Sequence, residues 1–220
     1  MSVWALLVAA GSGRRLGEER PKAFVRLGEL PLLAESLRRL DESSWVDSIV
    51  VAVPAGWEEP AILLAEEVAA TKVVASVTGG ATRADSVRAA LAEVADDALV
   101  VLVHDAARPL VTDAVLERVL APLSGGWDGV VPGLPLRDTL KRVERERVVA
   151  TVDRSDLVAV QTPQAFLAPV LRAAYADDAG ATDCSSLVEA RGGRVAVVEG
   201  DLRLAKITTP ADLELVESWL

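Results

Sequence analysis

The residues with the clearest potential for chemistry form a glycine-rich loop directly after an apolar run. Residues 3–10 are apolar, Gly11-Ser12-Gly13-Arg14-Arg15-Leu16-Gly17 follows at once, and Pro21-Lys22 comes soon after. Glycines let backbone N–H groups approach an anion, and arginine and lysine supply charged donors to its oxygens. The loop therefore predicts a phosphate-binding site.

This loop differs from two familiar glycine loops. A Walker A loop ends in Gly-Lys-Ser/Thr, which this loop lacks. A dinucleotide fingerprint has its third glycine three positions after the second. Here Gly17 comes four positions after Gly13, which is one position too late. The second predicted strand is followed by Pro54 rather than by an acidic residue that would bind a ribose. These differences disfavour a dinucleotide-dependent reductase.

A second glycine loop, Gly79-Gly80-Ala81-Thr82-Arg83-Ala84-Asp85-Ser86, lies between a predicted strand and a predicted helix. Backbone groups left uncovered by paired glycines suit the edge of a base, and Arg83 suits a phosphate. The alternative is an ordinary strand-to-helix loop in which Asp85 or Ser86 is the N-cap.

The motif His104-Asp105-Ala106-Ala107-Arg108-Pro109 follows another apolar strand. A carboxylate at this position suits a ribose or a metal ion, because burial without a partner would be costly. An internal Asp105–Arg108 pair is the alternative. His104 is the only histidine, and we interpret it as a hydrogen-bonded packing residue rather than as a catalyst.

Three clusters are weaker. Arg137-Asp138-Thr139 and Thr151-Val152-Asp153-Arg154 suit a second phosphate, although exposed hairpin charges are the better interpretation from sequence alone. Gln161-Thr162-Pro163-Gln164 follows a strand, and Lys206 is either a surface lysine or a cation directed into a cleft. Residues 182–186 are predicted to cap a helix.

Short apolar runs alternate with helical patterns along the chain. We predict strands over 3–9, 49–53, 73–77, 99–103, 129–131, 158–160 and 195–198, and helices over 32–40, 61–70, 86–94, 115–123, 170–176, 185–190 and 211–220. Thr209, Pro210 and Asp212 form a start signal for the last helix. This alternation predicts an α/β fold with a mostly parallel sheet and helices on both faces. Ligands of such sheets bind beyond the carboxyl ends of the strands.

One stretch breaks the alternation. Residues 138–143 and 148–154 flank the charged turn 144–147, which predicts an inserted β-hairpin. Because a lone hairpin is marginal in water, we expect residues 137–154 to form an arm that clasps a second subunit. The remainder indicates a single domain over 1–220.

The composition of the chain excludes several classes of partner and site. The net charge is -10, which argues against nucleic acid or an anionic membrane as a partner. Cys184 is the only cysteine, so an intrachain disulfide and a multi-cysteine zinc site are excluded. The apolar run near residue 3 is too short to span a membrane, and we expect a cytoplasmic protein. The absence of Asn suggests a thermophilic source, although GC-rich coding has a similar effect.

Taken together, the motifs resemble those of the 2-C-methyl-D-erythritol 4-phosphate cytidylyltransferases, in the nucleotidyltransferase superfamily with a Rossmann-like sheet. The resemblance extends over essentially the whole chain, and its most specific parts are Gly-x-Gly-Arg-Arg…Pro-Lys and His-Asp-Ala-Ala-Arg-Pro. It implies transfer of CMP from CTP to 2-C-methyl-D-erythritol 4-phosphate, with release of pyrophosphate, in non-mevalonate isoprenoid synthesis. It also implies Mg²⁺ as cofactor and a homodimer joined through the arm.

The resemblance assigns roles to residues of this chain. Arg15 and Lys22 are the implied catalytic cations. The nucleotide-binding residues are Ala9, Ala10, Gly11, Gly13, Arg14, Gly79, Gly80, Arg83 and Ser86. The residues around the sugar phosphate are Asp105, Arg108, Thr139, Arg154, Thr162 and Lys206. The metal is expected to be held mainly by CTP phosphates, with Asp105 as the one protein ligand considered.

Three other functions compete with this one. A cytidylyltransferase for ribitol 5-phosphate or another polyol phosphate would use the same loops. A sugar-nucleotide pyrophosphorylase is disfavoured because those chains are usually longer. A nucleotide-binding regulatory protein without turnover is disfavoured because Arg15 and Lys22 are both present.

Overall fold

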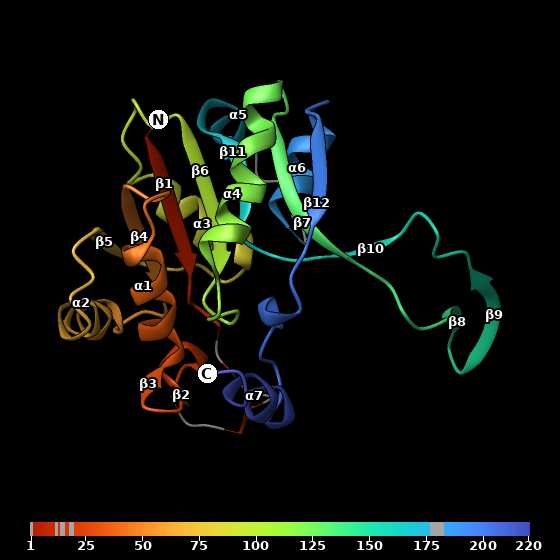
Figure 1. Ribbon diagram of the computed structural model, residues 1–220, viewed down its shortest axis with the longest axis horizontal. Helices are drawn as coiled ribbons and strands as arrows, with labels where there is room; N and C mark the ends of the chain where they lie inside the picture. The colour runs from red at the N-terminus through yellow and green to blue at the C-terminus, as the bar shows by residue number, and fades with distance from the viewer. Residues whose placement is uncertain (1, 12, 14–15, 18–19, 177–182) are drawn as a thin grey trace.

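The computed structural model describes residues 2–11, 13, 16–17, 20–176 and 183–220 (Figure 1). Its main sheet has eight strands in the described part of the chain. Their spatial order is β10 (Val158–Val160), β7 (Gly129–Pro135), β11 (Gln164–Leu167), β6 (Val100–Asp105), β1 (Val3–Val8), β4 (Ser48–Val53) and β5 (Val73–Thr78), with β12 (Val195–Glu199) also paired to β7. The β1–β4, β1–β6, β4–β5 and β7–β12 pairs are parallel. The predicted mainly parallel α/β sheet is therefore confirmed.

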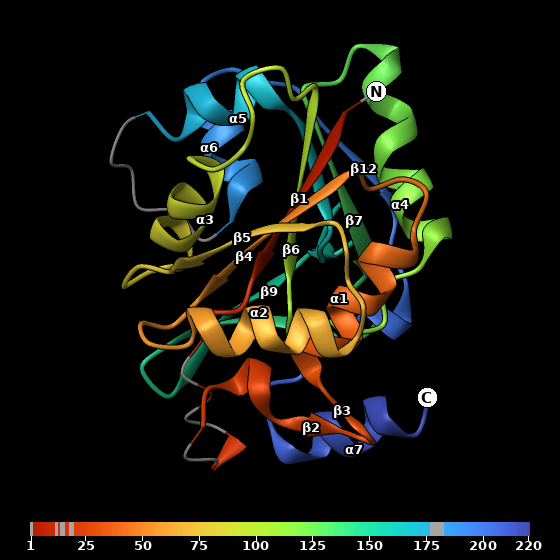
Figure 2. The same cartoon turned by 90° about the vertical axis from the view of Figure 1, so that its left-hand side faces the viewer.

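Helices cover both faces of this sheet because its strands are apolar on both sides. Along β1, Ala5 and Leu7 belong to one buried cluster and Leu6 to another. The first cluster includes α1 (Leu32–Glu42), α2 (Glu58–Glu67) and α4 (Asp113–Leu120), which is followed by the 3₁₀ helix η3 (Ala121–Gly125). The second includes α3 (Arg83–Leu91), α5 (Ala168–Ala174) and α6 (Cys184–Ala190). Figure 2 shows α3, α5 and α6 together on one face.

The carboxyl ends of the parallel strands meet at one edge of the sheet. Val8 at the end of β1 is in register with Asp105 on β6 and with Ala52 on β4. Val53 of β4 is in register with Thr78 of β5. The glycine loops and the Asp105 motif therefore leave the sheet side by side, as the parallel-sheet rule predicts.

A third, smaller core lies beyond this edge. It joins Val25 and Leu27 to Ile207 and Val216. It includes residues of β2 (Arg26–Leu27) and α7 (Pro210–Glu217). The neighbouring β3 (Leu30–Pro31) and the 3₁₀ helices η2 (Lys22–Phe24) and η4 (Leu202–Leu204) pack against the first cluster instead. Figure 1 shows α7 beside β2 and β3. This core holds the segments that carry Lys22 and Lys206 close to each other, although they are far apart in the sequence.

The predicted helix starts have different outcomes. Thr209 accepts a hydrogen bond from Asp212 N in a complete capping box, which confirms the start of α7. Asp183 is the N-cap of α6, while Thr182 lies outside the described residues. The idea that Asp85 or Ser86 is an N-cap is wrong, since Thr82 is the N-cap of α3 and Asp85 is its capping-box partner.

Other elements were not predicted from the sequence. The antiparallel strand β11 lies between β6 and β7, and β2 and β3 form a separate two-stranded sheet. Both are too short to show a period in the sequence. Among the described residues, no helix is long and apolar enough to cross a membrane.

The inserted hairpin is present. Strands β8 (Leu140–Glu144) and β9 (Arg147–Val152) pair with each other in a sheet of their own. Figure 1 shows them projecting from the body of the molecule. Val143, Val148 and Val149 are exposed on this hairpin, so its apolar side chains have water instead of a core beside them.

Candidate functional site

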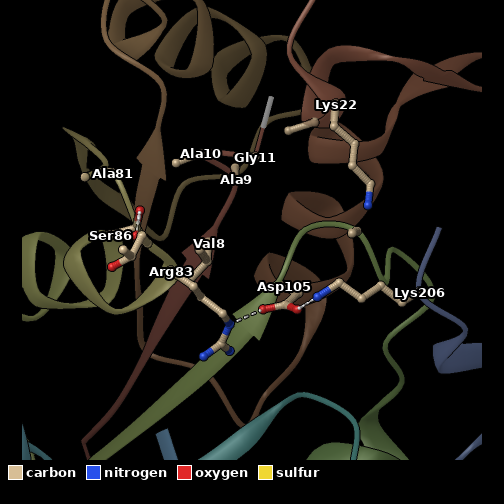
Figure 3. Close-up of a pocket in the computed structure, with 14 residues that line it drawn as sticks. Val8, Ala9, Ala10, Gly11, Lys22, Ala81, Arg83, Ser86, Asp105 and Lys206 are labelled. Atoms are coloured by element: carbon tan, nitrogen blue, oxygen red, sulfur yellow. Dashed lines mark hydrogen bonds and ion pairs between the residues drawn. The ribbon is translucent and has the colours of Figure 1, made fainter. Parts of the chain in front are cut away.

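A pocket of about 420 Å³ lies at the carboxyl edge of the sheet (Figure 3). The residues that line it come from the first loop, the second loop, the end of β6 and the segment before α7. They are Val8, Ala9, Ala10, Gly11, Lys22, Ala23, Gly80, Ala81, Thr82, Arg83, Ser86, Asp105, Ala107 and Lys206. Nine of the residues predicted from the sequence are therefore brought together: Ala9, Ala10, Gly11, Lys22, Gly80, Arg83, Ser86, Asp105 and Lys206.

Small residues form one wall of the pocket. Ala9 N donates to Ala52 O at 2.7 Å, and Gly79 N donates to Val53 O at 2.7 Å, so both loops continue the sheet pairing. Gly79 does not line the pocket, but a Cβ there would lie 2.4 Å from the Ala10 Cβ and 2.8 Å from Ser86 Oγ. The two loops can approach this closely only with glycine at position 79. This close approach leaves backbone groups at the pocket wall.

Lys22 is placed by the first loop. Lys22 N donates to Gly11 O at 3.3 Å. Gly13 has a φ of +67°, and a Cβ at that position would lie 2.8 Å from the Lys22 Cβ. Glycine at 13 therefore allows both the left-handed turn and the contact with Lys22. Arg14 and Arg15, which were predicted beside it, lie outside the described residues.

Asp105 is buried at the end of β6 between two cations. Arg83 Nε donates to Asp105 Oδ1 at 2.9 Å, and Lys206 Nζ donates to Oδ2 at 2.7 Å (Figure 3). Burial alone would raise the pKa of this carboxyl, but the charges and hydrogen bonds of Arg83 and Lys206 outweigh burial and lower it. Asp105 is therefore an anion. The alternative Asp105–Arg108 ion pair is wrong, because other cations occupy both oxygens.

Arg108 lies beside the pocket without lining it. Its Nη1 donates to Leu204 O at 2.5 Å, and its Nε is buried with no partner in the described part of the chain. Burial lowers the pKa of this guanidinium despite the neighbouring Asp105 charge. Arg108 thus ties the β6 loop to the segment that carries Lys206.

Hydrogen bonds of His104 and Thr162 also hold the loop that follows β6. His104 Nε2 lies 3.0 Å from Arg108 O, a carbonyl that can only accept, so Nε2 carries the proton. Nδ1 then accepts from the Thr162 hydroxyl at 3.1 Å, and Thr162 Oγ1 accepts from Asp105 N at 3.0 Å. The interpretation of His104 as a packing residue is confirmed. The hydroxyl proton of Thr162, predicted to face substrate, is instead engaged inside the protein.

Two predicted residues lie away from the pocket. Thr139 and Arg154 are exposed at the base of the hairpin, and Arg154 donates to Arg137 O. Sequence reasoning also missed pocket residues: Val8, Ala23, Ala81, Thr82 and Ala107. Each is adjacent in sequence to a predicted residue, but four of them are small and apolar and carry no chemical signal of their own, while the hydroxyl of Thr82 is the N-cap of α3.

Comparisons with known proteins agree with one another. The family model of 2-C-methyl-D-erythritol 4-phosphate cytidylyltransferase matches residues 3–220. The enzyme of that name from Nocardia farcinica is 50% identical over 220 residues, which cover 100% of this chain and 94% of the relative. The one from Rhodococcus jostii is 49% identical over 219 residues, covering 98% and 94%.

Solved structures show the same similarity. The crystal structure of 2-C-methyl-D-erythritol 4-phosphate cytidylyltransferase from Thermus thermophilus has a TM-score of 0.80 and 35% identity, covering 97% of this chain and 96% of that one. The Francisella tularensis structure of the same name has a TM-score of 0.84 and 28% identity, with 100% of both chains covered.

The buried imidazole predicts a specific pH dependence of stability. Burial lowers the pKa of His104 to about 4 from an ordinary 6.5. Between these values the unfolded chain binds a proton that the folded protein does not, so stability falls as the pH falls. Urea unfolding should give a free energy about 2 kcal/mol lower at pH 5 than at pH 7.

The variant His104→Gln is the matched control, because it keeps a donor for Arg108 O but does not titrate. Since the chain has one histidine, this variant should lose most of the difference between pH 5 and pH 7. The same pH dependence in both proteins would show that His104 is not held neutral by the fold.

Proposed function

Because this chain belongs to the 2-C-methyl-D-erythritol 4-phosphate cytidylyltransferase family, we infer that it is a nucleotidyltransferase that moves CMP from CTP to 2-C-methyl-D-erythritol 4-phosphate. The products are 4-CDP-2-C-methyl-D-erythritol and pyrophosphate, in non-mevalonate isoprenoid biosynthesis. The observation that supports this pocket as the site is its pairing of a small-residue wall with Lys22, Lys206 and the Arg83–Asp105 pair.

The reaction places few demands on acid–base chemistry. An oxygen of the acceptor phosphate attacks the α-phosphorus of CTP, and the bond from that phosphorus to the bridging oxygen breaks as pyrophosphate leaves. A phosphate monoester has a second pKa of about 6, so the nucleophile is already mostly a dianion at neutral pH. No general base is needed, which agrees with a histidine that is buried and hydrogen-bonded on both ring nitrogens.

The main obstacle is electrostatic. Two polyanions must meet, and negative charge shifts onto the α-phosphoryl group and the leaving oxygen. Lys22 lines the pocket and is held by the first loop. We assign to it, together with Arg15, the stabilisation of that charge. Gly11, Gly13 and Arg14 belong to the same phosphate-binding loop.

The small-residue wall suits the cytidine. Ala9, Ala10 and Gly80 line the pocket as small residues that leave room for a base, and Gly79 lets the two loops approach because a Cβ there would lie 2.4 Å from the Ala10 Cβ. The N–H groups of Ala9 and Gly79 are engaged in sheet pairing, so the other backbone groups of this wall serve the base. The Arg83 guanidinium pairs with Asp105. Ser86 Oγ donates to Thr82 O at 3.0 Å and is fixed at the start of α3. Backbone donors and acceptors at fixed positions can distinguish the edge of cytosine from other bases.

The cationic side suits the sugar phosphate. Lys206 is paired with Asp105 but remains 45% exposed in its side chain, so its ammonium can also contact an anion. Asp105 can accept from the polyol hydroxyls, while Arg108 and Thr162 hold its loop in place. Thr139 and Arg154 reach this subsite only if the arm of a second subunit brings them there.

Magnesium is the proposed cofactor. Within the described residues no group of three or more His, Cys, Asp or Glu side chains could hold a metal ion. Asp105 is the only carboxylate lining the pocket in the described ranges, and cations occupy both its oxygens. The residues therefore fit Mg²⁺ held mainly by the phosphate oxygens of CTP. Bound there, the ion would neutralise part of the triphosphate charge.

The proposal includes a homodimer and a cytoplasmic location. The hairpin leaves Val143 53% and Val148 55% exposed on a projecting arm, and burying such side chains against a second copy would remove apolar surface from water. A chain with one buried cysteine needs no oxidising compartment.

Acceptor choice tests the reaction directly. Pyrophosphate release from Mg²⁺-CTP should be rapid with 2-C-methyl-D-erythritol 4-phosphate and at least about a hundredfold slower with D-ribitol 5-phosphate, the size of selectivity that a few pocket contacts provide. The measurement is kcat/KM for each acceptor. A preference for ribitol 5-phosphate would contradict the acceptor, and CTP binding without any release would contradict catalysis.

Removing the Lys22 charge should slow turnover. For Lys22→Ala we expect kcat to fall by at least about a hundredfold while CTP still binds, because a donor to developing charge is lost. The matched control is Lys72→Ala, since Lys72 Nζ bonds to Ser43 O away from the pocket. Near-normal kcat in the Lys22 variant, with CTP binding intact, would remove Lys22 from this role.

The arm should carry the dimer contact. The double change Val143→Glu and Val148→Glu places like charges opposite each other in the hairpin register and should convert a dimer to a monomer in sedimentation at micromolar concentration. Val74→Glu is the control, because Val74 is equally exposed at 55% on β5 in the main sheet. A monomeric unmodified protein would refute the arm as an interface.

A further inference from the structure

Arg83 connects the pocket to a buried polar cluster behind it. Its Nε donates to Asp105 at 2.9 Å, and its Nη1 donates to the Cys184 sulfur at 3.4 Å. The guanidinium thus bridges the carboxylate in the site and a thiol that no step of the reaction uses. Its third nitrogen, Nη2, is buried with no partner in the described ranges.

The thiol is itself held by a tyrosine. Tyr175 Oη and Cys184 Sγ lie 3.1 Å apart in hydrogen-bond contact, and both residues are buried. Arg88 fixes the tyrosine from α3, with its guanidinium 5.9 Å from the ring centroid. Tyr175 caps the end of α5, Cys184 begins α6 and Arg83 begins α3. Figure 2 shows these helices together on one face of the sheet.

We propose that Tyr175 and Cys184 are positioning residues, which hold the Arg83 guanidinium against Asp105 and thereby set Lys206 for the acceptor phosphate. The proposal rests on the proposed function, in which Asp105 and Lys206 bind the sugar phosphate. Asp105 has one oxygen for each cation. A shift of Arg83 therefore frees one oxygen and changes where the carboxylate and Lys206 lie.

A thiol suits this position because it accepts a hydrogen bond without adding charge. Burial raises the pKa of Cys184, although the Arg83 charge acts in the opposite direction, so the sulfur stays neutral. A neutral acceptor orients Nη1 and leaves Asp105 as the anion that Arg83 pairs with. Without the sulfur, Nη1 would lose the partner described for it while the buried Nη2 already has none in the described ranges, and unsatisfied donors favour rearrangement.

The test measures the KM of each of the two substrates in steady-state kinetics. For Cys184→Ala we expect KM for the sugar phosphate to rise about tenfold, the effect of losing one hydrogen bond to a charged group, with KM for CTP little changed. Cys184→Ser keeps a small acceptor and should restore KM to within about threefold of the unmodified enzyme. Tyr175→Phe, which removes only the hydroxyl, should give an intermediate rise.

A packing control makes the outcomes distinct. Val188→Ala removes volume from the same buried cluster on α6 without touching the polar atoms, and it should lower the melting temperature without changing either KM. An equal rise of KM in Val188→Ala and Cys184→Ala would reduce Cys184 to a packing residue. If Cys184→Ala does not fold, KM for the sugar phosphate is compared between Cys184→Ser and Tyr175→Phe.

Lys206→Met tests the underlying assignment separately. If it raises KM for the sugar phosphate while the Cys184 and Tyr175 variants leave it unchanged, the positioning role is overturned and the proposed site stands. If Lys206→Met itself leaves that KM unchanged, the assignment of Lys206 to the acceptor is wrong, and the positioning proposal fails with it.

Discussion

The buried carboxylate of Asp105 is the interaction on which the site depends. Desolvation penalises a buried anion, and only close cations make the ionised form stable there. Arg83 and Lys206 supply them at 2.9 and 2.7 Å. Because these partners come from α3 and from the segment before α7, one carboxylate fixes three distant parts of the chain around a single pocket. Removing either cation would leave one carboxylate oxygen without its ion-pair partner and the other cation as the only compensation, so the three residues act as a unit.

This arrangement also reconciles an acidic protein with anionic substrates. The chain carries a net charge of -10, which repels polyanions at long range. Lys22 and Lys206 line the same pocket, where the first loop holds one and the ion pair with Asp105 holds the other. Cations already held in position cost little reorganisation when charge develops in the transition state. Local concentration of positive charge, rather than overall charge, is therefore what the pocket provides.

Much of this could be predicted from the sequence, for identifiable reasons. Alternating apolar strands and helices imply a parallel sheet, and that rule places the Gly79 and Asp105 motifs at one edge. The partners of Asp105 could not be predicted, since Arg83 and Lys206 are 22 and 101 positions away and the nearer Arg108 offered a plausible alternative. Strand β11 was missed because four residues show no periodicity. The role of Thr162 was also misjudged, because a hydroxyl's partners depend on tertiary packing.

The two sides of the pocket explain why one site can hold both substrates. In the proposed function, backbone groups next to Ala9, Ala10 and Gly80 would recognise shape and hydrogen-bond pattern, and they add no charge. In the same proposal, Lys22 and Lys206 would bind phosphate through their charge rather than through the shape of the ligand. The proposed function therefore puts the base on the first side and the second phosphate on the other, and Figure 3 shows the ammonium groups of Lys22 and Lys206 on the same side of Ala9 and Ala10. Held in this way, the α-phosphorus and the attacking oxygen would approach each other without a general base, and positioning and electrostatics would supply the rate enhancement.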